Sequence, residues 1–170
     1  MDIQDGDILL ISNQTILANM IKRALKCKYS HAGIVMYAEE YVGNNICLVA
    51  ETTAEGFILK EYARKVLIES ENIAGFRYIG GLKKEEKDRL KFEIARRMGR
   101  EYDTIDLIRL GIYYIFGFNL RYENARKLTC AEAVERCYRA INKPICPDII
   151  NPEDITPKDI QNSRYLKKVF

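Results

Sequence analysis

Short apolar runs in the first half of the chain predict a set of strands. Runs of roughly four to eight apolar residues, bounded by glycine or polar turn residues, are typical of strands in a folded sheet. The run Ala32–Ala38 is followed by a polar stretch, 39–45, and then by a second run, Ile46–Thr52. This succession predicts an antiparallel hairpin. The other predicted strands are Asp7–Ser12, Gly56–Tyr62 and Ile73–Ile79.

Helical spacing of apolar positions dominates most of the remaining chain. Asn13–Lys26 carries apolar residues three and four positions apart, and Ser12 or Asn13 could cap the helix that they predict. Lys83–Met98 is a charged amphipathic stretch that ends at Gly99. The further predicted helical segments are Thr104–Phe116, Thr129–Asn142 and a short turn at Thr156–Asp159. Because strands come first and helices later, we expect an α+β fold.

Length, composition and charge narrow the class of protein. A chain of 170 residues suits a single domain, spanning 1–170, that can bury a core of its own. Hydrophobic residues make up 48% of the chain and charged residues 30%, as in ordinary folded domains. The net charge of +3 is small, and the basic residues of 83–100 alternate with acidic ones, so we expect no nucleic-acid partner.

The opening sequence, the longest apolar-rich stretch and the cysteines indicate in which cellular compartment we expect the protein. The opening sequence MDIQDGDILLIS lacks the basic region of a signal peptide, and the apolar-rich stretch Ile105–Phe118 is interrupted by charges and too short to cross a bilayer. The five cysteines are odd in number and irregularly spaced. We therefore expect a cytoplasmic protein with reduced thiols. We expect no cofactor and no metal, since His31 with Cys27 forms only one short pair of ligands.

The sequence KLTCAEAVERC places one cysteine at the start of a helix. Thr129 and Glu132 stand three apart before an amphipathic run, which predicts a capping box with Cys130 at the first helical position. The partial positive charge of a helix N-terminus favours a thiolate, the nucleophile of covalent catalysis. The alternative is a thiol packed beneath the helix, as most unpaired cysteines are. We expect that packing role for Cys137 and Cys47.

A thiolate nucleophile needs an imidazole nearby, and the chain has one histidine, His31, in YSHAGIVMY. If the predicted hairpin is centred near residue 41, His31 lies opposite Glu51, which could hold one ring nitrogen and fix the tautomer. A slip of one residue in the pairing would put the two side chains on opposite faces. The alternative is a strand-edge histidine bonded to backbone. Tyr102, after the helix end at Gly99, could donate a hydrogen bond to an oxyanion.

Five short motifs in this order resemble a known family. They are GD at 6–7, SHAG at 30–33, AE at 50–51, YD at 102–103 and TCAE at 129–132. The set is similar to the circularly permuted branch of the NlpC-type papain-like cysteine hydrolases, the YiiX-like proteins, in which the histidine strand precedes the cysteine helix. The resemblance runs from about residue 5 to residue 166. It implies a permuted papain-like fold, with a small antiparallel sheet or half-barrel packed on helices.

The resemblance also implies roles for individual residues. Cys130 would be the nucleophile and His31 the base. Glu51 would orient His31, and Tyr102 would line the oxyanion site or position the substrate. Gly6–Asp7 would form a structural turn at the opening of the fold.

These observations lead to one function and two alternatives. We expect a thiol amidase or peptidase that forms an acyl-enzyme at Cys130 and acts on a small peptide or an amino-acid-like amide. The first alternative is acyl transfer to or from a lipid, as in lecithin–retinol acyltransferase-like proteins, with 105–118 as a membrane-facing flap. We favour a core helix for that stretch, and so give membrane association second place. The second alternative is a binding module of the same fold without activity. The sequence does not decide the oligomeric state.

Overall fold

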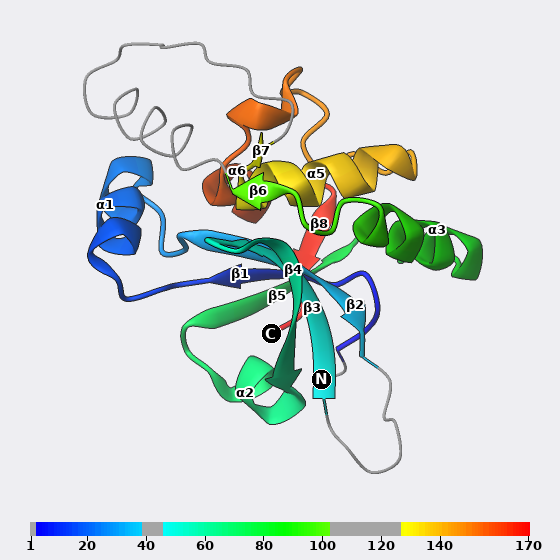
Figure 1. The fold of residues 1–170 in the computed structure, drawn as a ribbon, viewed down its shortest axis with the longest axis horizontal. Helices are drawn as coiled ribbons and strands as arrows, with labels where there is room; N and C mark the ends of the chain where they lie inside the picture. Colours follow the sequence, from blue (N-terminus) through cyan, green and yellow to red (C-terminus); the bar gives the residue numbers. More distant parts are fainter. Residues whose placement is uncertain (1–2, 39–45, 103–126) are drawn as a thin grey trace.

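The computed structural model describes residues 3–38, 46–102 and 127–170, and its centre is a six-stranded sheet (Figure 1). The strand order is β4-β3-β2-β1-β5-β8, and every neighbouring pair is antiparallel. The strands are β1 (Ile8–Ile11), β2 (His31–Tyr37), β3 (Ile46–Thr53), β4 (Gly56–Ala63), β5 (Ile73–Tyr78) and β8 (Leu166–Lys168). A separate parallel pair joins β6 (Glu101–Tyr102) to β7 (Lys127–Leu128).

Helices cover both faces of this sheet. The helices are α1 (Ile16–Leu25), α2 (Arg64–Glu69), α3 (Lys84–Ala95), α5 (Cys130–Ala140), the 3-10 helix η1 (Pro152–Asp154) and α6 (Pro157–Gln161). In Figure 1, α3, α5 and α6 lie on one side of the sheet and α2 lies on the other. The expected α+β class is therefore confirmed.

The central strand β1 is buried on both faces, which accounts for its unbroken apolar run. Alternate side chains of a strand point to opposite faces. Ile8 and Leu10 pack in the larger core with α5, whereas Leu9 and Ile11 pack in a second core with Leu67 of α2. The sheet is thus held between two apolar layers, and the larger one positions α5.

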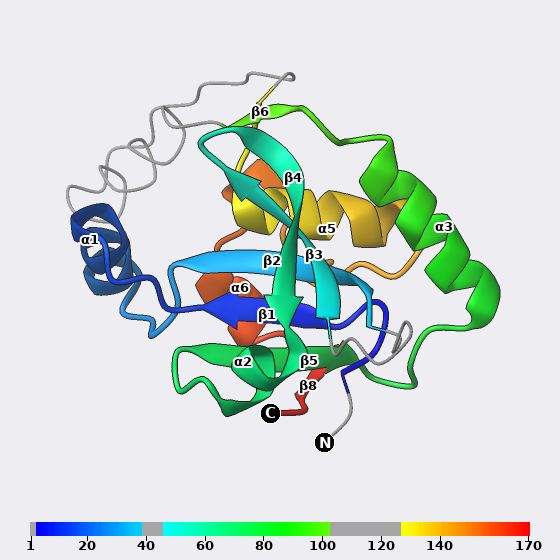
Figure 2. The same ribbon diagram turned by 60° about the horizontal axis from the view of Figure 1, so that its bottom comes forward.

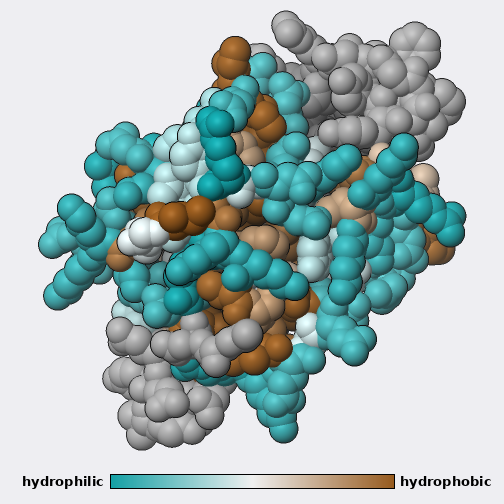
Figure 3. All heavy atoms as spheres, turned by 180° about the vertical axis from the view of Figure 1, so that it is seen from behind, coloured by the Kyte–Doolittle hydropathy of each residue, from teal (hydrophilic) through white to brown (hydrophobic). Residues whose placement is uncertain are grey.

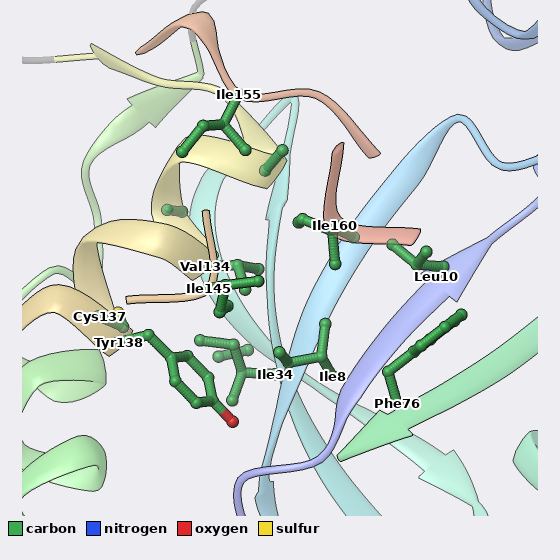
Figure 4. Close-up of a cluster of buried hydrophobic side chains, with 14 of the residues drawn as sticks. Ile8, Leu10, Ile34, Phe76, Val134, Cys137, Tyr138, Ile145, Ile155 and Ile160 are labelled. Carbon is green, nitrogen blue, oxygen red and sulfur yellow. The ribbon is translucent and has the colours of Figure 1, made fainter. Parts of the chain in front are cut away.

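Tyr138 of α5 ties the larger core to the opening turn of the chain. Its ring is fully buried beside the β1 and β2 side chains (Figure 4), and its hydroxyl donates a hydrogen bond to the carbonyl of Gly6. Gly6 adopts a positive φ of 88°, which favours glycine. The buried carboxylate of Asp7 accepts hydrogen bonds from Arg77 at 2.7 Å and from the backbone N–H of Gln4 at 2.8 Å. Gly6–Asp7 therefore has the structural role that we expect of it.

Several details differ from the sequence-based expectations. Thr15, rather than Ser12 or Asn13, caps α1, because its hydroxyl accepts the N–H of Ala18 at 3.1 Å. The Ser12 hydroxyl instead accepts from Lys22. The helix α2 was not expected. The segments 39–45 and 104–116 lie outside the described residues.

The charged helix is shorter than expected. It runs as α3 and has Arg96 at its C-cap, and Gly99, with a φ of 75°, follows three residues later. None of the helices in the three described ranges is long and apolar enough to cross a bilayer. Viewed from behind, the surface is largely hydrophilic, with hydrophobic side chains gathered in a few patches (Figure 3).

Candidate active site

A capping box sets the first turn of α5 and therefore the place of Cys130. The hydroxyl of Thr129 accepts the N–H of Glu132 at 3.3 Å, and a carboxylate oxygen of Glu132 accepts the N–H of Thr129 at 3.1 Å. These reciprocal bonds satisfy two backbone donors that the helix itself leaves free. Cys130 is the first residue of α5 and is 5% exposed. The predicted capping box is confirmed.

His31 begins β2, and its ring is held by a carboxylate on the neighbouring strand. The distance from His31 Nε2 to Glu51 Oε2 is 3.0 Å. The register differs from the expected one, because Gly33 rather than His31 lies opposite Glu51. The hairpin is centred one residue further along, which shifts the pairing by two residues. A shift of two leaves His31 and Glu51 on one face as diagonal neighbours.

Gly33 lies directly opposite Glu51, where β2 and β3 approach closely. Gly33 has no side chain, and a Cβ at that position would lie 3.5 Å from the Cβ of Glu51 and 2.9 Å from Val49 Cγ1. The close approaches are to Val49 and, at 3.1 Å, to the carbonyl oxygen of Ala50, so a larger residue would push against β3. The glycine of the SHAG motif therefore lets β2 and β3 pair closely at this point.

The first turn of α5 and the beginning of β2 lie toward the same side of the molecule (Figure 2). The Cys130 thiol is there hydrogen-bonded to the His31 side chain. Burial alone would raise the pKa of the Cys130 thiol. The charge and hydrogen bond of His31, with hydrogen bonds from the backbone of Ala32 and Ala131, lower it below its ordinary value. Burial alone would lower the pKa of His31, but Cys130 and Glu51 raise it to about 10. The two shifts favour a thiolate–imidazolium pair at neutral pH.

Which nitrogen of His31 faces the sulfur follows from the contact with Glu51. Because Nε2 is bonded to the carboxylate, Nδ1 is the nitrogen left for Cys130. The His31 side chain is 13% exposed to solvent, whereas the Glu51 side chain is 3% exposed. The carboxylate is thus shielded from solvent behind the imidazole.

Two side chains of β4 also contact Glu51, and neither was predicted from the sequence. The hydroxyl of Tyr62 donates to Glu51 Oε1 at 3.1 Å, and Lys60 Nζ lies 3.5 Å from the same oxygen. In β4 these two positions alternate with outward ones, so both side chains share the face of Glu51. Only the pairing of β3 with β4 brings them to Glu51, and a pattern within one strand does not reveal that register.

Comparison with known proteins identifies the family of the chain. Residues 2–165 match the family model described as permuted papain-like amidase enzyme, YaeF/YiiX, C92 family. The chain belongs to this family. A crystal structure of the metalloprotein YiiX from Escherichia coli O157:H7 is similar over 100% of this chain and 98% of that one, with a TM-score of 0.69 and 20% identity. That likeness confirms the permuted papain-like fold. No curated protein matches the chain.

The described residues place the backbone of Tyr102, the fourth expected site residue of this permuted papain-like chain. Tyr102 pairs with Leu128, two residues before Cys130, in the parallel contact of β6 with β7. Its backbone therefore runs beside the segment that leads into the cysteine helix. Its side chain lies outside the described part, and its role at an oxyanion stays a prediction.

The other cysteines of this family member occupy different surroundings. Cys137 and Cys47 are fully buried in the two apolar cores, as expected. Cys27 is hydrogen-bonded to Gln161 at 3.1 Å.

Among the residues of 3–38, 46–102 and 127–170, no group of three or more histidine, cysteine, aspartate or glutamate side chains could hold a metal ion.

Proposed function

We propose that this member of the permuted papain-like amidases is a cysteine amidase or peptidase that cleaves a small peptide or an amino-acid-like amide. One observation carries the proposal: of the chain's five thiols, that of Cys130 alone has a lowered pKa, and it contacts the only histidine. A reactive thiol that differs in this way from its neighbours marks a functional site. In this proposal Cys130, His31 and Glu51 form the triad.

The first half of the reaction forms an acyl-enzyme. The Cys130 thiolate attacks the carbonyl carbon of the amide, and the carbonyl π electrons move to oxygen. The tetrahedral species then collapses, the C–N bond breaks, and Nδ1 of the His31 imidazolium gives its proton to the leaving nitrogen. The products of this half are a thioester on Cys130, a free amine and a neutral His31.

The second half releases the acid. Neutral His31 takes a proton from water as the water oxygen attacks the thioester carbon. The C–S bond breaks, a carboxylic acid leaves, and the thiolate–imidazolium pair is restored. Throughout, Glu51 holds Nε2 and keeps Nδ1 directed toward the sulfur. Tyr102 is proposed to donate to the oxyanion or to position the substrate.

No step of this reaction passes through a metal. The similar Escherichia coli protein is a metalloprotein, but the described residues of this chain offer no cluster of ligands that would fit such an ion. The proposed activity rests on Cys130, His31 and Glu51, with Tyr102 at the oxyanion or the substrate.

The test is trapping of the acyl-enzyme. The full chain is incubated with a panel of aminoacyl and dipeptidyl 4-nitroanilides and, in parallel, with acyl-lipid esters, and intact-mass and peptide mass spectrometry locate any adduct. We expect 4-nitroaniline release with an acyl group on Cys130, and neither with the Cys130→Ala variant. The matched control, Cys137→Ala, removes a thiol of the same helix and should behave as the wild type. An adduct on another cysteine, turnover that survives Cys130→Ala, or acyl release from lipids alone would contradict the proposal.

A further inference from the structure

Glu51 contacts two side chains besides His31, those of Tyr62 and Lys60. Its side chain is 3% exposed, and both carboxylate oxygens have partners. Oε2 lies 3.0 Å from His31 Nε2 and also accepts from the Tyr62 hydroxyl at 3.3 Å. Oε1 accepts from the same hydroxyl at 3.1 Å and lies 3.5 Å from Lys60 Nζ. A single phenol therefore bridges both oxygens of the carboxylate that holds the histidine.

The geometry explains why such support is needed. Directly opposed residues of a strand pair meet without assistance, but Glu51 lies opposite Gly33 and reaches His31 along the diagonal. A glutamate has three rotatable bonds, so one contact leaves its carboxylate several rotamers. The Tyr62 hydroxyl restricts that freedom, because its one proton is shared between the two oxygens.

We propose that Tyr62 and Lys60 are positioning residues, which hold Glu51 in the orientation that occupies Nε2 of His31 and directs Nδ1 toward Cys130. This inference rests on the proposed function for its catalytic consequence, but the positioning itself is a property of the folded protein. Neither residue contacts the reacting atoms. Both act on them through Glu51.

The charges around the group agree with this arrangement. The titratable groups that face Glu51 are His31 from β2 and Lys60 and Tyr62 from β4, and those that face His31 are Glu51 and Cys130. Burial alone would raise the pKa of Glu51, but His31, Lys60 and Tyr62 lower it. Burial, with the charge of Glu51, raises the pKa of Tyr62, so that its hydroxyl keeps the proton that it donates.

The sole histidine gives this inference a direct readout. In 15N-histidine-labelled protein every imidazole signal belongs to His31, so NMR reports its tautomer and the exchange of its Nε2 proton with water. We expect Tyr62→Phe to speed that exchange about tenfold. It should also slow the alkylation of Cys130 by iodoacetamide at pH 7 by about the same factor, with little change in melting temperature. Tyr165→Phe, at the opposite edge of the sheet beside β8, is the matched control and should change neither rate.

A second variant tests the charge. Lys60 is 55% exposed, and Lys60→Met removes a positive charge near Glu51 and His31 without emptying the core. Loss of the contact between Lys60 and Glu51 leaves Oε1 of Glu51 with the Tyr62 hydroxyl alone, so the Nε2 proton of His31 should exchange a few-fold faster, an effect smaller than that of Tyr62→Phe. Unchanged exchange of the His31 Nε2 proton in Tyr62→Phe or in Lys60→Met would overturn the inference for that residue. Because neither readout needs a substrate, the inference can stand or fall even if no amide is cleaved.

Discussion

Cys130 and Cys137 lie on one helix, two turns apart, and both are buried, yet their thiols have opposite properties. The pKa of Cys137 is raised to about 12 because burial is hardly opposed where it packs. Burial also raises the pKa of Cys130, but His31 and two backbone N–H groups lower it by more than burial raises it. Burial therefore does not decide whether a thiol is inert. The hydrogen-bond partners at the start of α5 decide whether the thiol is reactive. The same helix therefore carries a reactive thiol, Cys130, and an inert one, Cys137, for comparison.

Removal of each thiol in turn tests the contrast between Cys130 and Cys137 most directly. We expect Cys130→Ala to lower amide turnover by on the order of a thousandfold or more, because the nucleophile is lost. Cys137→Ala should keep turnover within about twofold. It should instead lower the free energy of unfolding by roughly 1–2 kcal/mol, since it leaves a small cavity in the core. Steady-state kinetics and urea unfolding of both variants measure the contrast. Equal losses of turnover would remove it.

The next largest effect concerns the partner that distinguishes the two cysteines. In His31→Ala the pKa of Cys130 should return toward or above that of an ordinary thiol, because burial then goes unopposed by a cation. Alkylation of Cys130 at pH 7 should slow on the order of tenfold to a hundredfold. Site-resolved mass spectrometry after iodoacetamide labelling measures this rate from pH 5 to pH 10. Cys146, whose pKa is raised to about 12 chiefly by burial, is the internal control in the same samples.

A smaller effect appears in the pH dependence of stability. Relative to ordinary values of 6.5 and 9.0, folding raises the pKa of His31 and lowers that of Cys130. Between these two pH values both states bind one proton on the pair, so this pair adds no slope. Below pH 6.5 the unfolded state binds more protons than the folded state, so stability falls as the pH is lowered. Above pH 9.0 the folded state binds more, and stability falls as pH rises, by at most about 1.4 kcal/mol per pH unit.

Urea unfolding across this range tests that plateau against a variant. In Cys130→Ala the thiolate that does most to raise the pKa of His31 is absent while burial still lowers it, so the loss of stability above pH 9.0 should shrink. Identical profiles for the wild type and the variant would show that the two groups do not share a proton in the folded state.

The smallest effect comes from the cap that places Cys130. Thr129→Ala should cost about 1 kcal/mol of unfolding free energy, because it removes the oxygen that accepts the N–H of Glu132. It should also slow Cys130 alkylation by a few-fold as the first turn loosens. Thr156→Ala removes the equivalent cap of α6 and is the matched control, with a similar cost but unchanged labelling. Chemical denaturation and labelling of both variants separate the two outcomes.

Features fixed by residues close in sequence could be predicted, and features fixed by strand pairing only in part. The capping box of Thr129 and Glu132 spans one helical turn, so its residue types were sufficient. The pairing of His31 with Glu51 was expected on one face, but through the wrong register. The pairing of β2 with β3 shifts between Val35 and Tyr37, and such an irregularity leaves no mark in the pattern of apolar residues.

The contacts that sequence reasoning missed all depend on a third strand or on tertiary context. Lys60 and Tyr62 reach Glu51 because β4 pairs with β3, which the alternation of residues within β4 does not specify. The helix α2 (Arg64–Glu69) is short and has no side-chain cap, so its stability comes from Leu67 in the second core rather than from local signals.

The order of the motifs along the chain has a consequence for biosynthesis. A ribosome makes the strand with His31 first and the helix with Cys130 last, and 99 positions separate the two residues. In the folded protein Tyr138 of that helix bonds to Gly6, which joins late sequence to early sequence. Until His31 and Cys130 lie together, we expect the thiol to keep the ordinary reactivity of an unstructured cysteine. Labelling of Cys130 at mildly acidic pH should then report how much of a preparation has folded.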